Sequence, residues 1–95
     1  MNEQATPSKR EQYLQWVRER AIKEMDFYLQ DGQSLSARIG ALGTAIGSIQ
    51  SDLTKDASTA NDKELRQKAH QVSIALTQGI IVTREQMVAL INEFV

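Results

Sequence analysis

The segment LSARIGALGTAIGSIQSDL, at residues 35–53, shows the most regular pattern in this chain. Its large apolar residues recur at alternating steps of four and three. This is the heptad spacing of a coiled-coil seam, along which one helix packs on another. The seam consists of Leu35, Ile39, Leu42, Ile46, Ile49 and Leu53. We therefore predict a helix over residues 34–54 that packs lengthwise on a neighbouring helix.

A second stripe, made of small residues, runs beside this seam on the same predicted helix. It consists of Ser36, Gly40, Gly43 and Gly47. Small side chains let two helix backbones approach closely. Glycine lowers the stability of a helix by about 1 kcal/mol relative to alanine, so close packing must compensate. We interpret the stripe as a helix-contact groove that serves the monomer's own packing, another subunit or partner, or a membrane surface.

Capping signals place the first helix. Ser8 is followed three residues later by Glu11, the pattern of a capping box. Gly32 is suited to the left-handed conformation that follows many helices. We predict a flexible lead-in over residues 1–7 and a helix over residues 8–30.

The third helix is expected to begin at Asn61, where Glu64 completes a capping pattern, and to cover residues 61–95. Gly79 is unfavourable inside a helix, and residues 83–86 (TREQ) repeat the capping-box pattern. We favour one continuous helix over residues 61–95. A break near Gly79, which would give four helices, is the alternative.

These elements predict an all-α fold in a single domain, residues 1–95. The second and third helices would form a long antiparallel hairpin, and the first would pack across it in a three-helix bundle. The longer third helix would extend past the hairpin and expose an apolar end, which monomers rarely leave bare. The predicted interface residues are Trp16, Met87, Leu90, Ile91 and Phe94.

The composition fits a small globular protein and excludes several functional classes. Of the 95 residues, 41% are hydrophobic and 24% charged, and the net charge is −1. The chain therefore lacks the basic footprint of nucleic-acid binders. Without cysteine it has no disulfide or thiolate metal site. The polar N-terminal residues, and the absence of an apolar run near roughly 20 residues, predict a cytoplasmic protein; export without a signal stays open.

Residues with catalytic or metal-binding chemistry are scattered along the chain. His70 is the only histidine, and its helical neighbours form no carboxylate cluster. No paired carboxylates, phosphate loop or nucleophile motif has the spacing that catalysis requires. We therefore predict no enzyme activity, no catalytic residues, and no cofactor or metal site.

Charge-free segments indicate contact with another protein. No charged residue lies between Arg38 and Asp52, whereas the outer faces of surface helices normally carry charges. We predict a small non-enzymatic interaction or assembly module, adaptor or chaperone-like, that binds a protein partner or itself as a homodimer or larger assembly. We expect no nucleic-acid partner, and a membrane partner is disfavoured. In size and helix pattern the chain resembles small helical-hairpin proteins of bacterial secretion systems, such as needle subunits and their chaperones.

Two other functions remain as alternatives. The first is a monomeric inhibitor or immunity-type protein that binds a single target through Tyr13, Trp16 and Arg20, residue types that dominate binding hot spots. The second is a membrane-active protein that uses the amphipathic helix at residues 34–54.

Overall fold

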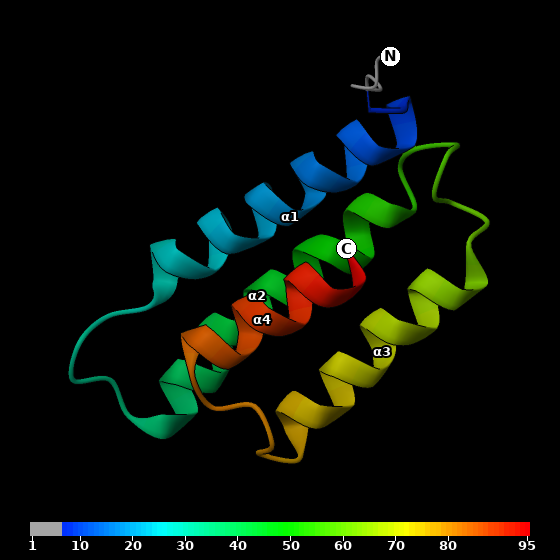
Figure 1. Ribbon diagram of the computed structural model, residues 1–95. Helices are drawn as coiled ribbons and strands as arrows, with labels where there is room; N and C mark the ends of the chain where they lie inside the picture. Colours follow the sequence, from blue (N-terminus) through cyan, green and yellow to red (C-terminus); the bar gives the residue numbers. More distant parts are fainter. Residues whose placement is uncertain (1–6) are drawn as a thin grey trace.

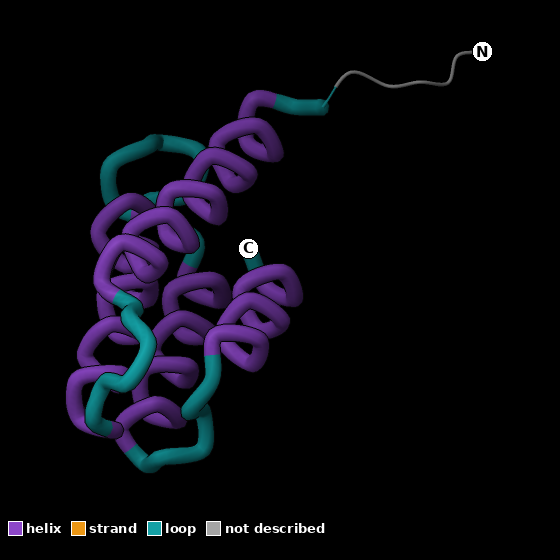
Figure 2. Tube along the Cα trace, turned by 90° about the vertical axis from the view of Figure 1, so that its left-hand side faces the viewer, coloured by secondary structure: helices purple, strands orange, loops and turns teal. Residues whose placement is uncertain are grey.

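The computed structural model describes residues 7–95, so the predicted lead-in at residues 1–7 falls outside it except for Pro7. The described chain is all-helical. Its helices are α1 (Lys9–Tyr28), α2 (Leu35–Leu53), α3 (Lys63–Thr77) and α4 (Arg84–Phe94). Consecutive helices run in opposite directions, and α4 lies across from α2, between α1 and α3 (Figures 1 and 2). The predicted all-α bundle is confirmed, in its four-helix form.

The first two helices begin where their caps predicted. At the start of α1, Ser8 Oγ accepts a hydrogen bond from the Glu11 amide (3.0 Å), and the Glu11 carboxylate accepts one from the Ser8 amide (2.8 Å). Ser34 Oγ caps α2 in the same way. These side chains satisfy amides that have no partner within the helix. Both helices end within two residues of their predicted ends.

The continuous helix predicted over residues 61–95 is wrong, because α3 ends at Thr77. Gly79 adopts a left-handed conformation (φ +76°). Its amide binds the Leu76 carbonyl, while the Ile80 amide binds the Ala75 carbonyl. This pair of bonds is the Schellman motif, which terminates a helix at glycine.

Two side-chain caps mark the starts of α3 and α4. The α3 cap is Asp62, whose carboxylate accepts from the Leu65 amide (2.9 Å); the predicted start at Asn61 is one residue early. Thr83 and Gln86 form a capping box that starts α4. The chain therefore reverses at residues 78–83, and α4 returns along the bundle.

The predicted seam forms the centre of the core. Leu42, Ile46, Ile49 and Leu53 are buried, whereas Leu35, at the first turn of α2, is 58% exposed. The other helices complete the core with one apolar face each. Its further members include Val17, Ala21, Met25, Leu65, Ala69, Val72, Leu76, Ile81, Met87 and Ile91.

The return of α4 removes the predicted exposed apolar end. Met87 and Ile91 are fully buried in the chain's own core, so their assignment to an exposed interface is wrong. Leu90 and Phe94 are half-buried against the core cluster. The prediction failed because it depended on a continuous third helix. Among the helices of residues 7–95, none is long and apolar enough to cross a membrane.

Polar contacts join α4 to α1 at both ends. The Arg84 guanidinium donates two hydrogen bonds to the Asp26 carboxylate (2.6 and 2.9 Å). Arg18 donates to the main-chain oxygen of Val95 (2.7 Å). The later residue of α1 pairs with the start of α4, and the earlier residue of α1 pairs with the end of α4. The helices α1 and α4 are therefore antiparallel.

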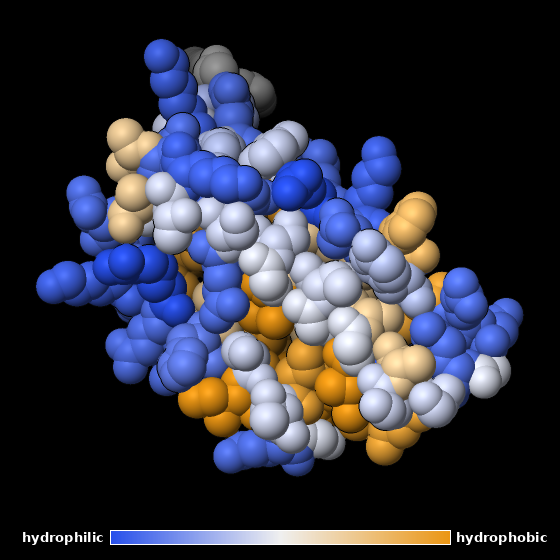
Figure 3. Space-filling view, turned by 180° about the vertical axis from the view of Figure 1, so that it is seen from behind, coloured by the Kyte–Doolittle hydropathy of each residue, from blue (hydrophilic) through white to orange (hydrophobic). Residues whose placement is uncertain are grey.

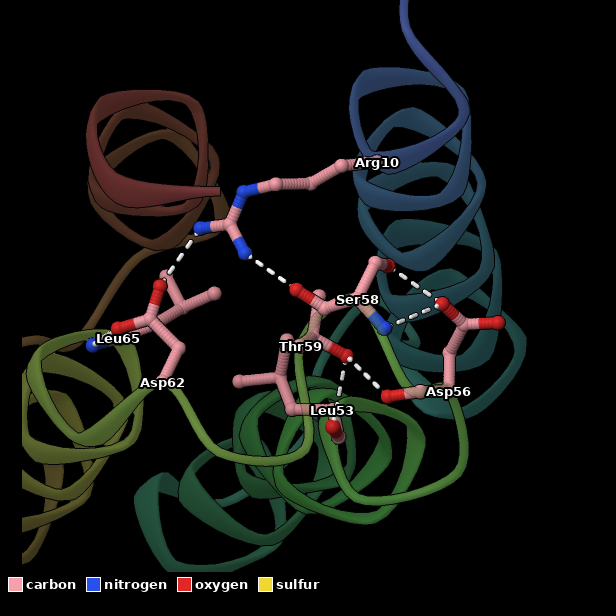
Figure 4. Close-up of polar contacts among 7 residues, drawn as sticks. All are labelled: Arg10, Leu53, Asp56, Ser58, Thr59, Asp62 and Leu65. Carbon is pink, nitrogen blue, oxygen red and sulfur yellow. Dashed lines mark hydrogen bonds and ion pairs between the residues drawn. The ribbon is translucent and has the colours of Figure 1, made fainter.

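The loop between α2 and α3 is held by an arginine of α1 and by side chains of the loop itself (Figure 4). Arg10, from α1, donates to the Ser58 carbonyl and to the Asp62 carboxylate, both at 2.6 Å. The buried Thr59 hydroxyl donates to the Leu53 carbonyl (2.7 Å). Asp56 accepts from the Ser58 amide and hydroxyl. These bonds fix residues 54–62 as an ordered connection, which sets the spacing of α2 and α3.

Candidate interaction surfaces

The structure divides the predicted helix-contact groove of Ser36, Gly40, Gly43 and Gly47 into an inner and an outer part. A Cβ atom at Gly43 would lie 3.6 Å from Leu76 Cδ2 of α3, so this glycine belongs to a contact within the monomer. At Gly40 and Gly47 a Cβ atom would meet nothing within 4 Å. Both glycines and Ser36 are exposed. The predicted groove therefore consists of an internal contact at Gly43 and an open strip formed by Ser36, Gly40 and Gly47.

The open strip is part of a wider surface, which we call the α2 outer face. It comprises the exposed and half-exposed residues Ser36, Ala37, Gly40, Thr44, Gly47, Ser48, Gln50 and Ser51. None of these residues is charged. Figure 3, which views the molecule from behind, shows pale and apolar residues across the middle of this side and hydrophilic ones around its margin. Uncharged groups cost less to remove from water than ions do, so this face is suited to burial against another molecule.

A second surface lies on α1, where aromatic and basic side chains are arranged around a buried aspartate. Trp16 is 48% exposed. The guanidinium carbon of Arg20 lies 5.6 Å from the centre of the Trp16 ring, a cation–π distance. Tyr13 precedes Trp16 by three residues, and the centres of their two rings lie 5.5 Å apart. The predicted residues Tyr13, Trp16 and Arg20 are therefore neighbours in the structure.

Asp52, at the end of α2, positions this cluster. It is fully buried, and its carboxylate accepts a hydrogen bond from Arg20 Nε (2.8 Å). The Tyr13 hydroxyl donates to the Asp52 carbonyl (2.5 Å). Lys55 adds a looser ion pair to the same carboxylate, at 3.6 Å. One buried residue of α2 thus holds two side chains of the α1 surface in place.

The electrostatic setting keeps the Tyr13 hydroxyl protonated. Burial raises the pKa of Tyr13, and the carboxylates of Asp52 and Asp56 raise it further, while Arg20 acts in the opposite direction. A neutral hydroxyl is the form that donates to the Asp52 carbonyl. Sequence reasoning did not assign this role to Asp52. The signal was present, because Asp52 is the one acidic residue beside the seam of residues 35–53.

The remaining predicted interface residues, Leu90 and Phe94, line a hollow between α3 and α4. It has a volume of about 300 Å³, and Val72 and Ala75 complete its apolar lining. Lys68, Gln71 and Glu93 supply its polar lining. The hollow is an exposed extension of the core, at the place where the sequence predicted a wholly exposed apolar end.

Groups with metal-binding chemistry stay apart in the folded chain. Within residues 7–95, no three His, Cys, Asp or Glu side chains are grouped so as to hold a metal ion. His70 is exposed on α3.

Comparisons with protein-family models, curated proteins and solved structures gave no match to this chain. The candidate interaction surfaces of residues 7–95 are therefore the α2 outer face and the aromatic surface of α1.

Proposed function

We propose that this protein is a non-enzymatic interaction or assembly module that self-associates through the α2 outer face. The observation that supports the proposal is the absence of charge on that face. In a two-fold symmetric contact, residues near the axis meet their own copies. A charged residue there would face a like charge, which opposes association. The α2 outer face has no such residue.

The two open glycines give the proposal a second argument. Gly40 and Gly47 lie inside α2, where each lowers helix stability by about 0.5–1 kcal/mol relative to alanine. Neither position needs glycine for space within the monomer, since a Cβ atom would meet nothing within 4 Å. Because these two positions have no side chain, a second helix could pack closely on the backbone of α2. In the proposed assembly, the contact between chains offsets the helix stability that the two glycines cost.

Molar mass from light scattering on a size-exclusion column, over a hundredfold range of concentration, tests the proposal. We expect the wild-type chain to reach at least twice the mass of one chain as concentration rises. Gly47→Lys should shift it to the mass of one chain, because lysine adds bulk and a like charge at the contact. Gln67→Lys, at an exposed position of α3, is the matched control and should leave the mass unchanged.

The variant also separates loss of contact from loss of fold. Lysine has a higher helix propensity than glycine, so Gly47→Lys should make the monomer more stable while it weakens association. A wild-type chain that stays monomeric at every concentration would refute the proposal. So would a Gly47→Lys chain that associates like the wild type.

A monomeric result would favour the second candidate, an inhibitor-type protein that binds a single target. The observation that supports this candidate is the fixed arrangement of Tyr13, Trp16 and Arg20 on α1, since Trp, Tyr and Arg dominate the energetics of protein interfaces.

A further inference from the structure

Four side chains form a stripe along the exposed side of α1, which we call the α1 stripe: Trp16, Arg20, Lys23 and Phe27. They are spaced by four, three and four residues, so they share one side of the helix. Together with Glu19, Glu24 and Tyr28 they line a shallow hollow of about 710 Å³. We propose that the α1 stripe is a docking surface for a helix of a partner protein that presents carboxylates between two apolar side chains.

The ends of the stripe supply the apolar contacts. Phe27 is 77% exposed, the highest value among the large hydrophobic residues of the described chain, and Trp16 is half exposed. The Phe27 ring packs edge-on against Tyr28, with ring centres 5.0 Å apart. Trp16 and Phe27 are eleven residues apart, or about 16 Å along a helix. Two apolar side chains of a partner helix at the same spacing would reach both ends.

The middle of the stripe is basic and has unused hydrogen-bonding capacity. Arg20 bonds Asp52 through Nε, and its two terminal nitrogens have no acceptor among residues 7–95. Lys23 is exposed and has no ion-pair partner in that part of the chain. Glu19, one turn before Lys23 on the helix, accepts a hydrogen bond from Gln15 (3.1 Å). Carboxylates of a partner would accept hydrogen bonds from both cations, Arg20 and Lys23.

The margins of the stripe define the partner more narrowly. Glu19 and Glu24 also line the hollow, so a densely anionic surface would meet like charges on either side of Arg20 and Lys23. This disfavours an acidic membrane as the ligand, because the protein surfaces that bind such membranes are rich in lysine and arginine. A protein helix with its carboxylates confined to the centre avoids that repulsion. Charge complementarity therefore selects a protein over a lipid surface.

Two members of the α1 stripe, Trp16 and Arg20, are held in place by contacts within the chain itself. The buried Asp52 holds Arg20, and the Arg20 guanidinium lies over the Trp16 ring. Side chains that are already fixed lose less conformational entropy on binding. Neither Gly40 nor Gly47 belongs to the α1 stripe, so the proposed docking does not depend on self-association through the α2 outer face.

Trp16 is the single tryptophan of the chain, so its fluorescence reports directly on the α1 stripe. The probe is a synthetic helical peptide without tryptophan. It carries two leucines spaced as Trp16 and Phe27 are, and glutamates at the positions that match Arg20 and Lys23. A second peptide has lysine in place of both glutamates. We expect the acidic peptide to change the emission saturably and to bind at least about tenfold more tightly than the basic one.

Two variants and one matched control complete the experiment. Phe27→Ser and Lys23→Gln should each weaken binding of the acidic peptide by about tenfold or more. Ile80→Ser removes an apolar side chain of similar exposure from the α3–α4 loop and should leave binding unchanged. The Gly47→Lys chain should bind the acidic peptide like the wild type, which keeps this test separate from that of self-association.

Several outcomes would overturn the proposal. These are no saturable change with the acidic peptide, equal binding of the basic peptide, and binding that Phe27→Ser leaves intact. Vesicles of phosphatidylglycerol are titrated in parallel. A larger response to these vesicles than to the acidic peptide would identify a lipid surface as the ligand and refute a protein partner.

Discussion

Gly47 and Gly79 should respond to alanine substitution with opposite signs. A Cβ atom at either position would meet nothing within 4 Å, so neither alanine is opposed by a steric clash. The two positions differ in backbone conformation. Gly79 has a φ of +76°, whereas Gly47 lies in the body of α2 and is not among the positive-φ glycines. The pair therefore isolates the effect of the backbone.

The expected magnitudes follow from these conformations. Gly47→Ala should raise the free energy of unfolding by about 0.5–1 kcal/mol, because alanine loses less conformational freedom in a helix. Gly79→Ala should lower it by about 1–2 kcal/mol, because an L side chain is strained in the left-handed region. For a chain of this size, 1 kcal/mol corresponds to about 4–8 °C in the melting temperature. The two variants should therefore melt several degrees above and below the wild type.

Urea unfolding followed by far-ultraviolet circular dichroism measures both changes, at a protein concentration low enough to populate the monomer. A Gly47→Ala chain that is no more stable than the wild type would refute the open environment assigned to this glycine. A Gly79→Ala chain of unchanged stability would refute the left-handed turn. At high concentration the advantage of Gly47→Ala should shrink, because the added methyl group would lie in the proposed contact between chains.

Three further predictions concern the monomer. Gly43→Leu should lower the free energy of unfolding by about 1–3 kcal/mol through overpacking against Leu76; an unchanged urea midpoint would contradict this contact. Leu42→Ala should cost about 2–5 kcal/mol, since Leu42 is fully buried in the core, and calorimetry would show it as a lower melting temperature. The Arg84 hydrogen bond lowers the pKa of Asp26, so its stabilising effect is present above the ordinary carboxyl pKa of about 3.9 and is lost as the pH falls through the lower folded-state pKa. Asp26→Asn should therefore melt lower than the wild type at neutral pH and lose less stability on acidification; parallel pH profiles would contradict the pair.

The helices that sequence predicted well are those with strong local signals. The seam of residues 35–53 and the caps at Ser8 and Ser34 set α1 and α2, because a cap depends only on residues within one turn. The signals for a break, Gly79 and the cap at Thr83, were also local. They were outweighed by apolar residues that continue at helical spacing across the break. Such spacing does not distinguish one long helix from two helices that bury the same face in the same core.

The candidate surfaces were harder to predict because they depend on how helices meet. Sequence placed Gly43 and Gly47 in one stripe, but only the position of Leu76 shows that the first is internal and the second open. The anchoring role of Asp52 depends likewise on the register of α1 against α2. Met87 and Ile91 were assigned to an interface because the return of α4 was not foreseen.

The contacts between α1 and α4 have a consequence for the order of folding. The bond between Asp26 and Arg84 joins residues 58 apart, and that between Arg18 and Val95 joins residues 77 apart. Contacts between residues so distant close the largest loops, and their entropy cost comes before they give any stabilisation. We expect the α1–α2 hairpin to form early and α4 to dock last. During synthesis, the core would then stay open on one side until α4 has left the ribosome.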